Sequence, residues 1–177
     1  MIDKCLTAMY PVDKGRIVIR SIELSDCKSI TDIYNCYIET TTSTFEEIPI
    51  TVLEMQDRVN RIRELFTYLV YEENGEILGY AYVDTFHSRS AYRFTLEDSI
   101  YLRNGYQGKG IGKALLDKLL NEVKKRDTHS IVAKIALPNE RSVNLHEAFG
   151  FKNAGILKEV GRKFDKWLDV GYWELIL

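Results

Sequence analysis

The stretch from residue 99 to residue 116 constrains the fold most, because it reads as a strand, a glycine-rich turn and the start of a helix. Ile100 and Leu102 alternate with neighbours of different character, which is the period of a strand with two unlike faces. Four glycines follow within eight residues, before an Ala-Leu-Leu run begins a helical pattern. Glycines let backbone N–H groups approach a ligand, and the first turn of a helix has unpaired N–H groups with partial positive charge. The stretch, with Lys109 and Lys113 in it, therefore predicts a cradle for a phosphate or pyrophosphate.

Spacing excludes two familiar phosphate-binding motifs. A P-loop needs Ser or Thr after its Gly-Lys pair, and the residue there is Ala114. A dinucleotide fingerprint needs a third glycine where this chain has Lys113. The pattern that remains after these exclusions is Gln107-x-x-Gly110-x-Gly112. A tight turn without a ligand is the alternative interpretation.

Length and charge narrow the class of protein. The 177 residues and 20.5 kDa predict a single domain, 1–177, that begins with a weakly patterned extension over 1–15. A formal charge of −2 gives no support for nucleic acid or a membrane surface as partner. The sequence has no apolar run of about 20 residues and no signal-peptide core. Three scattered cysteines predict neither a disulfide framework nor a metal site, so we expect a cytoplasmic protein without a metal.

Hydrophobic periodicity predicts the order β-α-α-β-β-β-α-β-α-β-β. We expect strands at 16–22, 66–72, 77–84, 95–102 and 130–137, a final pair of strands within 151–177, and helices ending near 39, 65, 126 and 149. Thr51-Val52-Leu53-Glu54 is a capping box, and Asn74-Gly75 is a hairpin turn signal. The near-continuous apolar run at 130–137 predicts a strand buried on both faces. We expect these elements to form an α/β fold, in which a mixed sheet has helices on both faces.

The motif Gln107-x-x-Gly110-x-Gly112 resembles the acetyl-CoA signature of the GNAT acetyltransferase family. Other segments stand in the order found in the phosphinothricin and methionine sulfoximine N-acetyltransferase branch: Tyr37-Ile38-Glu39-Thr40-Thr41, 91–97, Ile100-Tyr101-Leu102, Leu137-Pro138-Asn139, 142–151 and 167–173. The resemblance implies the GNAT fold, with a mostly antiparallel sheet of about seven strands. It also implies acetyl transfer from acetyl-CoA to the amine of a small amino-acid-like substrate.

The resemblance also implies which residues contact acetyl-CoA. Main-chain amides near Tyr101 and Leu102 would pair with the pantetheine arm, and the loop and helix amides would hold the pyrophosphate. Asn139 is expected to bind the pantetheine arm, to cap a helix, or both, and Ser142 offers a hydroxyl. The complete expected set is Ile100, Tyr101, Leu102, Gln107, Gly108, Lys109, Gly110, Ile111, Gly112, Lys113, Asn139 and Ser142.

Acetyl transfer to an amine requires a base for the ammonium, a polarised carbonyl and a stabilised sulfur leaving group. Glu97 lies just upstream of the glycine motif and is the candidate base, acting directly or through a water. Asp98 is the neighbouring alternative, but it projects to the opposite face of a strand. The resemblance assigns His146 as proton donor to the departing thiolate. A solvated glutamate and a structural histidine are the simpler interpretations of Glu97 and His146.

Arg93 and Arg89 are candidate anchors for the acidic group of an amino-acid-like substrate, because a guanidinium binds carboxylate or phosphinate oxygens in a two-pronged manner. Tyr92, Tyr37 and Glu39 are expected to line the same site. No cysteine lies near the glycine motif, which favours direct attack in a ternary complex.

Two other functions remain open from the sequence. The acceptor could be a protein N-terminus, a lysine or a polyamine, with the same chemistry. The chain could instead be a non-catalytic acyl-CoA sensor, against which the presence of both Glu97 and His146 argues. We expect a homodimer, although Tyr172 and Trp173 suit a buried sheet as well as a dimer interface.

Overall fold

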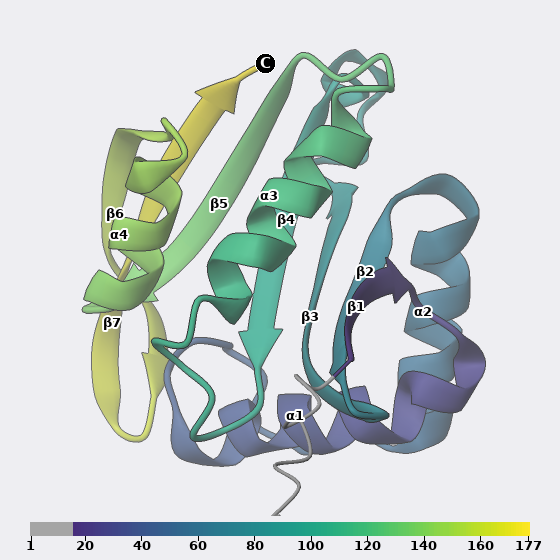
Figure 1. Cartoon of the computed structure of the whole chain (residues 1–177). Helices are drawn as coiled ribbons and strands as arrows, with labels where there is room; N and C mark the ends of the chain where they lie inside the picture. Colours follow the sequence, from purple (N-terminus) through teal and green to yellow (C-terminus); the bar gives the residue numbers. More distant parts are fainter. Residues whose placement is uncertain (1–15) are drawn as a thin grey trace, which may run out of the picture.

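The computed structural model describes residues 16–177, so the expected extension over 1–15 lies outside the described residues. The strands are β1 (Ile17–Ser21), β2 (Tyr68–Glu73), β3 (Glu76–Thr85), β4 (Thr95–Leu102), β5 (Ser130–Leu137), β6 (Lys152–Lys163) and β7 (Lys166–Ile176). The helices are α1 (Cys27–Thr40), α2 (Val52–Leu65), α3 (Ile111–Val123) and α4 (Glu140–Ala148), with short 3-10 turns at Leu24–Asp26 and Ser90–Tyr92. Figure 1 shows this order, and it confirms the predicted sequence of elements.

The seven strands form one mixed sheet in the order β1-β2-β3-β4-β5-β7-β6. Within the described chain, β4 and β5 are the one parallel pair, and the other neighbours are antiparallel. This confirms the predicted mostly antiparallel sheet. The parallel pair lies at the centre, where a crossover through α3 joins its two strands.

The predicted helix cap and hairpin turn are present in the structure. The hydroxyl of Thr51 accepts a hydrogen bond from the Glu54 amide, and the Glu54 carboxylate accepts one from the Thr51 amide, which is the expected capping box of α2. Asn74 and Gly75 have φ of 54° and 83°, as the turn between β2 and β3 requires. The predicted strand at 66–72 begins later, at residue 68, because the amide of Phe66 still donates to the helical carbonyl of Ile62.

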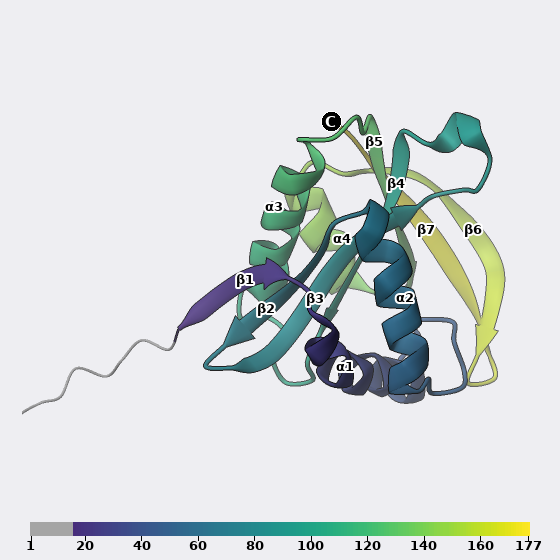
Figure 2. The same cartoon turned by 90° about the vertical axis from the view of Figure 1, so that its right-hand side faces the viewer.

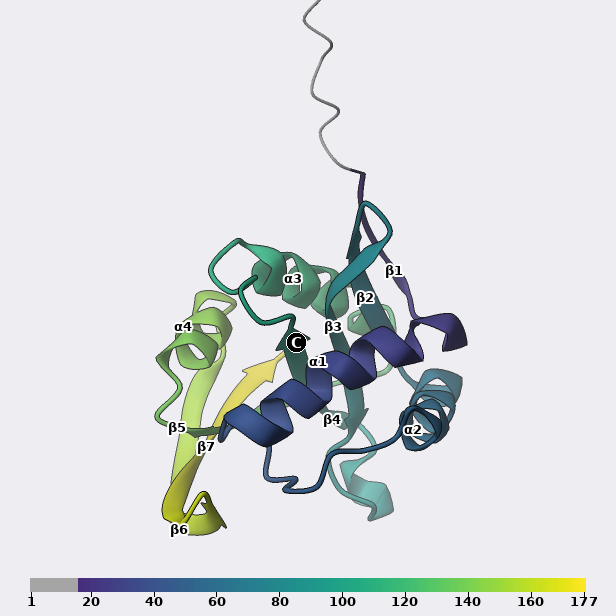
Figure 3. The same cartoon turned by 90° about the horizontal axis from the view of Figure 1, so that it is seen from below.

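Helices lie on both faces of the sheet, with α3 on one side and α1 and α2 on the other (Figures 2 and 3). Each face has its own hydrophobic core. One face packs against α3 through buried leucines such as Leu115 and Leu119. The other packs against α1 and α2, where Ile30 and Val59 are fully buried. No helix among residues 16–177 is long and apolar enough to span a bilayer.

Candidate active site

The ladder between β4 and β5 ends halfway along both strands. Pairing runs from Thr95 with Ser130 to Asp98 with Ala133, although β4 continues to residue 102 and β5 to residue 137. We call the unpaired region, in which β4 residues 99–102 face β5 residues 134–137, the split. In the part of the chain that the structure describes, main-chain groups of β4 that point toward β5 have no sheet partner there.

The main-chain donors in the split can be identified from the alternation of the strand. The amide of Arg103 donates to the Leu78 carbonyl on β3 at 2.8 Å, so the amides of Leu102 and Ile100 point to the other side, toward β5. The Leu102 amide donates to the hydroxyl of Tyr37 at 3.2 Å, which brings α1 to the split. By the same alternation, the amide of Tyr101 faces β3. Of the expected strand donors, those of Ile100 and Leu102 are therefore the ones aimed at the split.

The glycine loop leads from the split to the start of α3. Gly105, Gly108 and Gly110 have φ near +80°, which other residues adopt only with strain. Gly110 is the N-cap of α3, and an added Cβ at Gly108 or Gly110 would meet no atom within 4 Å. The side chain of Gln107 accepts a hydrogen bond from the Gly105 amide at 2.9 Å and so orders the loop from within.

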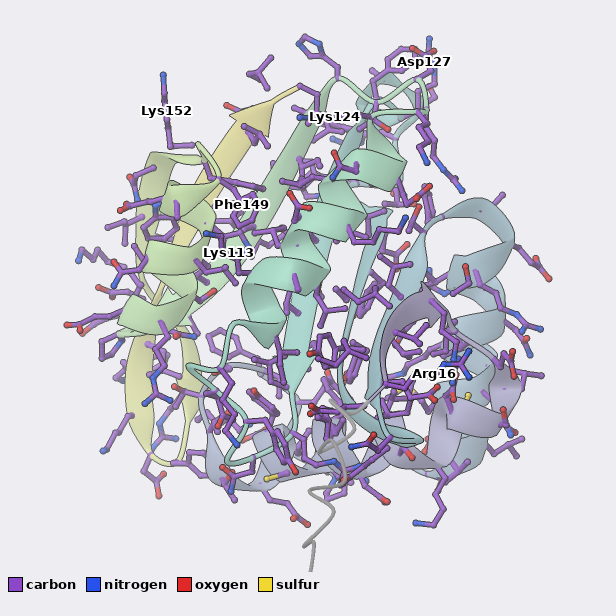
Figure 4. The ribbon with its side chains drawn as sticks, in the orientation of Figure 1. Arg16, Lys113, Lys124, Asp127, Phe149 and Lys152 are labelled. Carbon is purple, nitrogen blue, oxygen red and sulfur yellow. The ribbon has the colours of Figure 1, made fainter. Side chains whose placement is uncertain are left out.

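Positive charge surrounds this helix start. The first-turn amides of Ile111, Gly112 and Lys113 precede the first intrahelical bond of α3, from the Ala114 amide to the Gly110 carbonyl. Figure 4 labels Lys113 in this turn and Phe149 at the end of α4; both lie between the two helices in that view. The Lys109 ammonium lies 4.2 Å from the centre of the Tyr106 ring. Free amides, open space beside the glycines and two lysines together fit the pyrophosphate of acetyl-CoA.

Glu97 lies on β4, where it forms the last residue pair but one before the split. Its carboxylate contacts the Lys134 ammonium at 2.5 Å, and the side chains are 26% and 31% exposed. Burial raises the pKa of Glu97 above its usual value, and Lys134 opposes this increase. Glu97 is thus a half-buried carboxylate close to the split, with a pKa above that of an exposed glutamate.

Asp98 points to the opposite face of β4, as its neighbouring position predicts. Its Oδ2 lies 3.0 Å from Nε2 of His146 on α4, and both side chains are almost fully buried. The His146 Nδ1–H donates to the Ser142 carbonyl at 2.7 Å. Because both ring nitrogens face acceptors, a doubly protonated ring satisfies this site. Burial alone would lower the pKa of His146, but the Asp98 charge and these hydrogen bonds outweigh it and raise the pKa.

Asn139 and Ser142 lie at the start of α4. The Asn139 side-chain oxygen accepts a hydrogen bond from the Ser142 amide at 3.2 Å, so the capping role is present. The Ser142 hydroxyl lies 3.4 Å from Nδ1 of His146. These two residues therefore connect the end of β5 to the buried histidine.

The candidate substrate residues come from two places. Arg89, Tyr92 and Arg93 lie in the exposed segment around the 3-10 turn after β3, where Arg93 stacks 4.1 Å from the Phe94 ring and donates to the Ser90 carbonyl. Tyr37 and the exposed Glu39 lie near the end of α1.

A groove of about 520 Å³ begins beside Tyr92 and runs over the sheet to β6. Its lining includes Thr95, Val132 and Tyr172, which lie on the same face of the sheet as Glu97 and Lys134. The groove therefore lies beside the strand position of Glu97, whose partner Val132 lines it, and Tyr92 brings the arginine-bearing segment to its other end.

Comparison with known proteins assigns this chain to a family. Residues 19–171 match the acetyltransferase (GNAT) domain. The chain is 37% identical over 162 residues to phosphinothricin N-acetyltransferase of Streptomyces viridochromogenes, covering 92% of this chain and 88% of the relative. It is 35% identical over 168 residues to the L-methionine sulfoximine/L-methionine sulfone acetyltransferase of Salmonella typhimurium, covering 91% and 95%. A solved GNAT-superfamily phosphinothricin acetyltransferase from Sinorhizobium meliloti, in complex with acetyl-CoA, superposes with a TM-score of 0.88 at 37% identity, covering 91% of this chain and 88% of that one.

The chain belongs to the GNAT acetyltransferase family. Both sequence relatives carry the names of the branch that the sequence resembles, so the predicted resemblance is confirmed. Acetyl-CoA is present in the solved relative, as the predicted cosubstrate requires.

Two features of the site are not among the predictions from the sequence. Lys134 lies within the apolar run that predicts a buried strand, yet a lysine in the middle of such a run is itself a signal of a charged partner. The pairing of Asp98 with His146 joins positions 48 residues apart, and only the fold brings them together.

Proposed function

We propose that this chain transfers the acetyl group of acetyl-CoA to the amine of a small amino-acid-like substrate of the phosphinothricin or methionine sulfoximine and sulfone type. The observation that carries the proposal is the Glu97 carboxylate, half-buried near the end of the β4–β5 ladder, where the strand amides that follow have no sheet partner among residues 16–177. The names of the two relatives support the substrate class.

Glu97 takes the proton of the substrate ammonium, directly or through a water. Its raised pKa favours this role, because a stronger base removes the proton more readily. The neutral amine then attacks in a ternary complex, without an acetylated side chain.

Acetyl-CoA supplies an activated thioester when bound. The amides of Ile111, Gly112 and Lys113 and the Lys109 side chain would hold its pyrophosphate, and the glycines would let it approach. The Leu102 amide would pair with the pantetheine arm after giving up its bond to Tyr37. The side-chain nitrogen of Asn139, which its cap does not use, would bind the same arm.

His146 is proposed as the proton donor for the sulfur leaving group. Its raised pKa supports the protonated state that a donor needs. Both of its N–H groups already meet acceptors, so donation requires the ring to leave Asp98 or Ser142.

Arg93 and Arg89 are proposed to bind the acidic group of the amino acid, with Tyr92, Tyr37 and Glu39 around it. The groove beside Tyr92 supports this arrangement, because its lining includes both Tyr92, from the arginine-bearing segment, and Val132, the strand partner of Glu97.

The test is thiol release from acetyl-CoA with a panel of amines. We expect turnover with phosphinothricin or methionine sulfone and none with a peptide N-terminus, lysine or polyamine. Glu97→Gln should lower turnover by about 10²–10⁴-fold at nearly unchanged acetyl-CoA affinity. Glu72→Gln is the matched control, because Glu72 is also 26% exposed and pairs with Arg20 at 2.8 Å, away from the split.

The other outcomes identify the alternatives. Turnover restricted to peptides or polyamines would change the acceptor class. Tight acetyl-CoA binding without thiol release for any amine would favour a sensor, and full turnover of Glu97→Gln would reject the base.

We also infer a cytoplasmic homodimer. Exposed apolar side chains on the β6–β7 hairpin support a partner surface: Ile156, Leu157, Val160, Phe164 and Trp167. Cys27 and Cys36 form no disulfide within residues 16–177, which suits a reducing compartment. Light scattering should give twice the chain mass, and a monomer at assay concentration would reject the dimer.

A further inference from the structure

Lys134 is the charged residue of a strand that is otherwise buried or half-buried. Its neighbours Ala133 and Ile135 are buried, whereas its own side chain is 31% exposed. It pairs with Tyr172 of β7 and shares a sheet face with Glu97. An apolar residue would bury well at this position, so the lysine calls for an explanation.

The ammonium of Lys134 has two neighbours. Its Nζ lies 2.5 Å from the Glu97 carboxylate, across the last rungs before the split, and 5.6 Å from the centre of the Phe86 ring. Phe86 belongs to the segment that carries the candidate substrate arginines and contacts Tyr92 edge-on at 5.9 Å. Lys134 thus lies between the candidate base and the wall of the groove.

The other ionisable groups near Glu97 do not replace this contact. Asp84 faces Glu97 from β3, but it is an anion and pairs with Arg61 at 2.9 Å. Asp98 lies on the other face with His146, and the Tyr82 phenol on β3 has its pKa raised to about 12 by burial. Lys134 is therefore the cation that contacts Glu97 within residues 16–177.

A general base must be unprotonated before its substrate arrives. Burial disfavours the carboxylate form of Glu97, and the Lys134 charge and hydrogen bond favour it. The cation also fixes one carboxylate oxygen, which limits the orientations of the other.

We infer that Lys134 is a positioning residue of the reaction, whose ammonium holds Glu97 ionised and oriented until the substrate amine is in place. This inference rests on the proposed function, in which Glu97 is the base. If the ion pair only joined two strands, a change in the ionisation of Glu97 would not change turnover.

The direct test is a carboxyl titration of the full chain. Glutamate carboxyl carbons labelled with ¹³C are followed by NMR, and the Glu97 signal is assigned by its loss in Glu97→Gln. In Lys134→Met the titration midpoint of Glu97 should rise by about one pH unit, the lower end of the effect of an adjacent opposite charge. In Lys134→Arg, which retains the charge, the midpoint should stay near the wild-type value.

Two further variants serve as controls. Lys28→Met removes an exposed ion pair with Asp32, 2.9 Å long and on α1, and should not move the Glu97 signal. Lys134→Gln replaces Lys134→Met if the latter does not fold, since an amide is tolerated at a half-exposed position. The acid limb of kcat, measured with acetyl-CoA and methionine sulfone, should move upward with the carboxyl midpoint.

A midpoint in Lys134→Met and Lys134→Gln that coincides with the wild type would overturn the inference, as would an equal shift in Lys134→Arg. These results differ from a failure of the proposed function. If Glu97→Gln retains full turnover, Glu97 is not the base whatever the titration shows. If Glu97→Gln is inactive and the lysine variants titrate normally, only the role of Lys134 is rejected.

Discussion

Replacing Asp98 with asparagine is expected to convert its buried charged pair with His146 into a neutral pair of nearly the same shape. The His146 Nδ1–H donates to the Ser142 carbonyl, so a neutral ring carries its lone pair on Nε2. The amide of an asparagine can donate to that nitrogen. Because every bond of the ring remains satisfied, we expect a loss of only about 1 kcal/mol in the free energy of unfolding.

His146→Leu should cost much more. It leaves the Asp98 carboxylate without a counter-charge; this side chain has no solvent exposure, and its Oδ1 has no hydrogen-bond partner among residues 16–177. Breaking a buried pair in this way costs about 3–5 kcal/mol, a large part of the stability of a typical domain.

The pH dependence of the free energy of unfolding distinguishes the effect of the His146 charge from the effect of side-chain shape. The folded-state pKa of His146 is raised, so the stabilisation from its charge is complete below the unfolded value of about 6.5 and is lost as the pH rises through the folded value. Urea unfolding from pH 6 to 9 should show the gap between wild type and Asp98→Asn shrinking as the pH rises. Lys28→Met, which breaks an exposed pair, should stay within about 1 kcal/mol of wild type throughout. A constant gap, or a loss below about 1 kcal/mol in His146→Leu, would refute a buried imidazolium.

Two further predictions concern binding. Gly110→Ala should weaken acetyl-CoA binding measured by calorimetry, because φ of +84° is strained for alanine and the added Cβ enters the open space of the cradle. Gly75→Ala is the control and should leave binding unchanged, because it has the same strain, at φ of +83°, in a distant hairpin. Equal affinity in both variants would contradict the cradle. Arg93→Ala should raise KM for the amino acid by about tenfold or more, because it removes a two-pronged, charge-assisted contact, and should leave KM for acetyl-CoA unchanged. A change confined to acetyl-CoA would move Arg93 to the cofactor site.

Most of the fold could be predicted because its signals are local. The strand at 95–102 and the strand at 130–137 have the predicted bounds, and the capping box of α2 and the turn at Asn74-Gly75 formed as expected. Each of these depends on residues a few positions apart, where periodicity and turn chemistry act directly.

The interior of the site was less predictable because its contacts join distant segments. Alternation along β4 correctly separated Glu97 from Asp98, but it could not name Lys134 or His146 as their partners. The split itself has no sequence signature, since the apolar pattern of β5 continues past Ala133, where pairing stops.

A strand whose pairing stops midway offers main-chain N–H donors, which every amino acid except proline carries. Changes of side chain at Ile100 or Leu102 alter packing but leave the main-chain donors in place, so an alanine scan of this segment would report on stability and overlook binding. Proline is the informative substitution, since it alone removes the N–H. Residues 99–102 of β4 can thus diverge in sequence while the main-chain donors that the proposed cofactor contact uses persist.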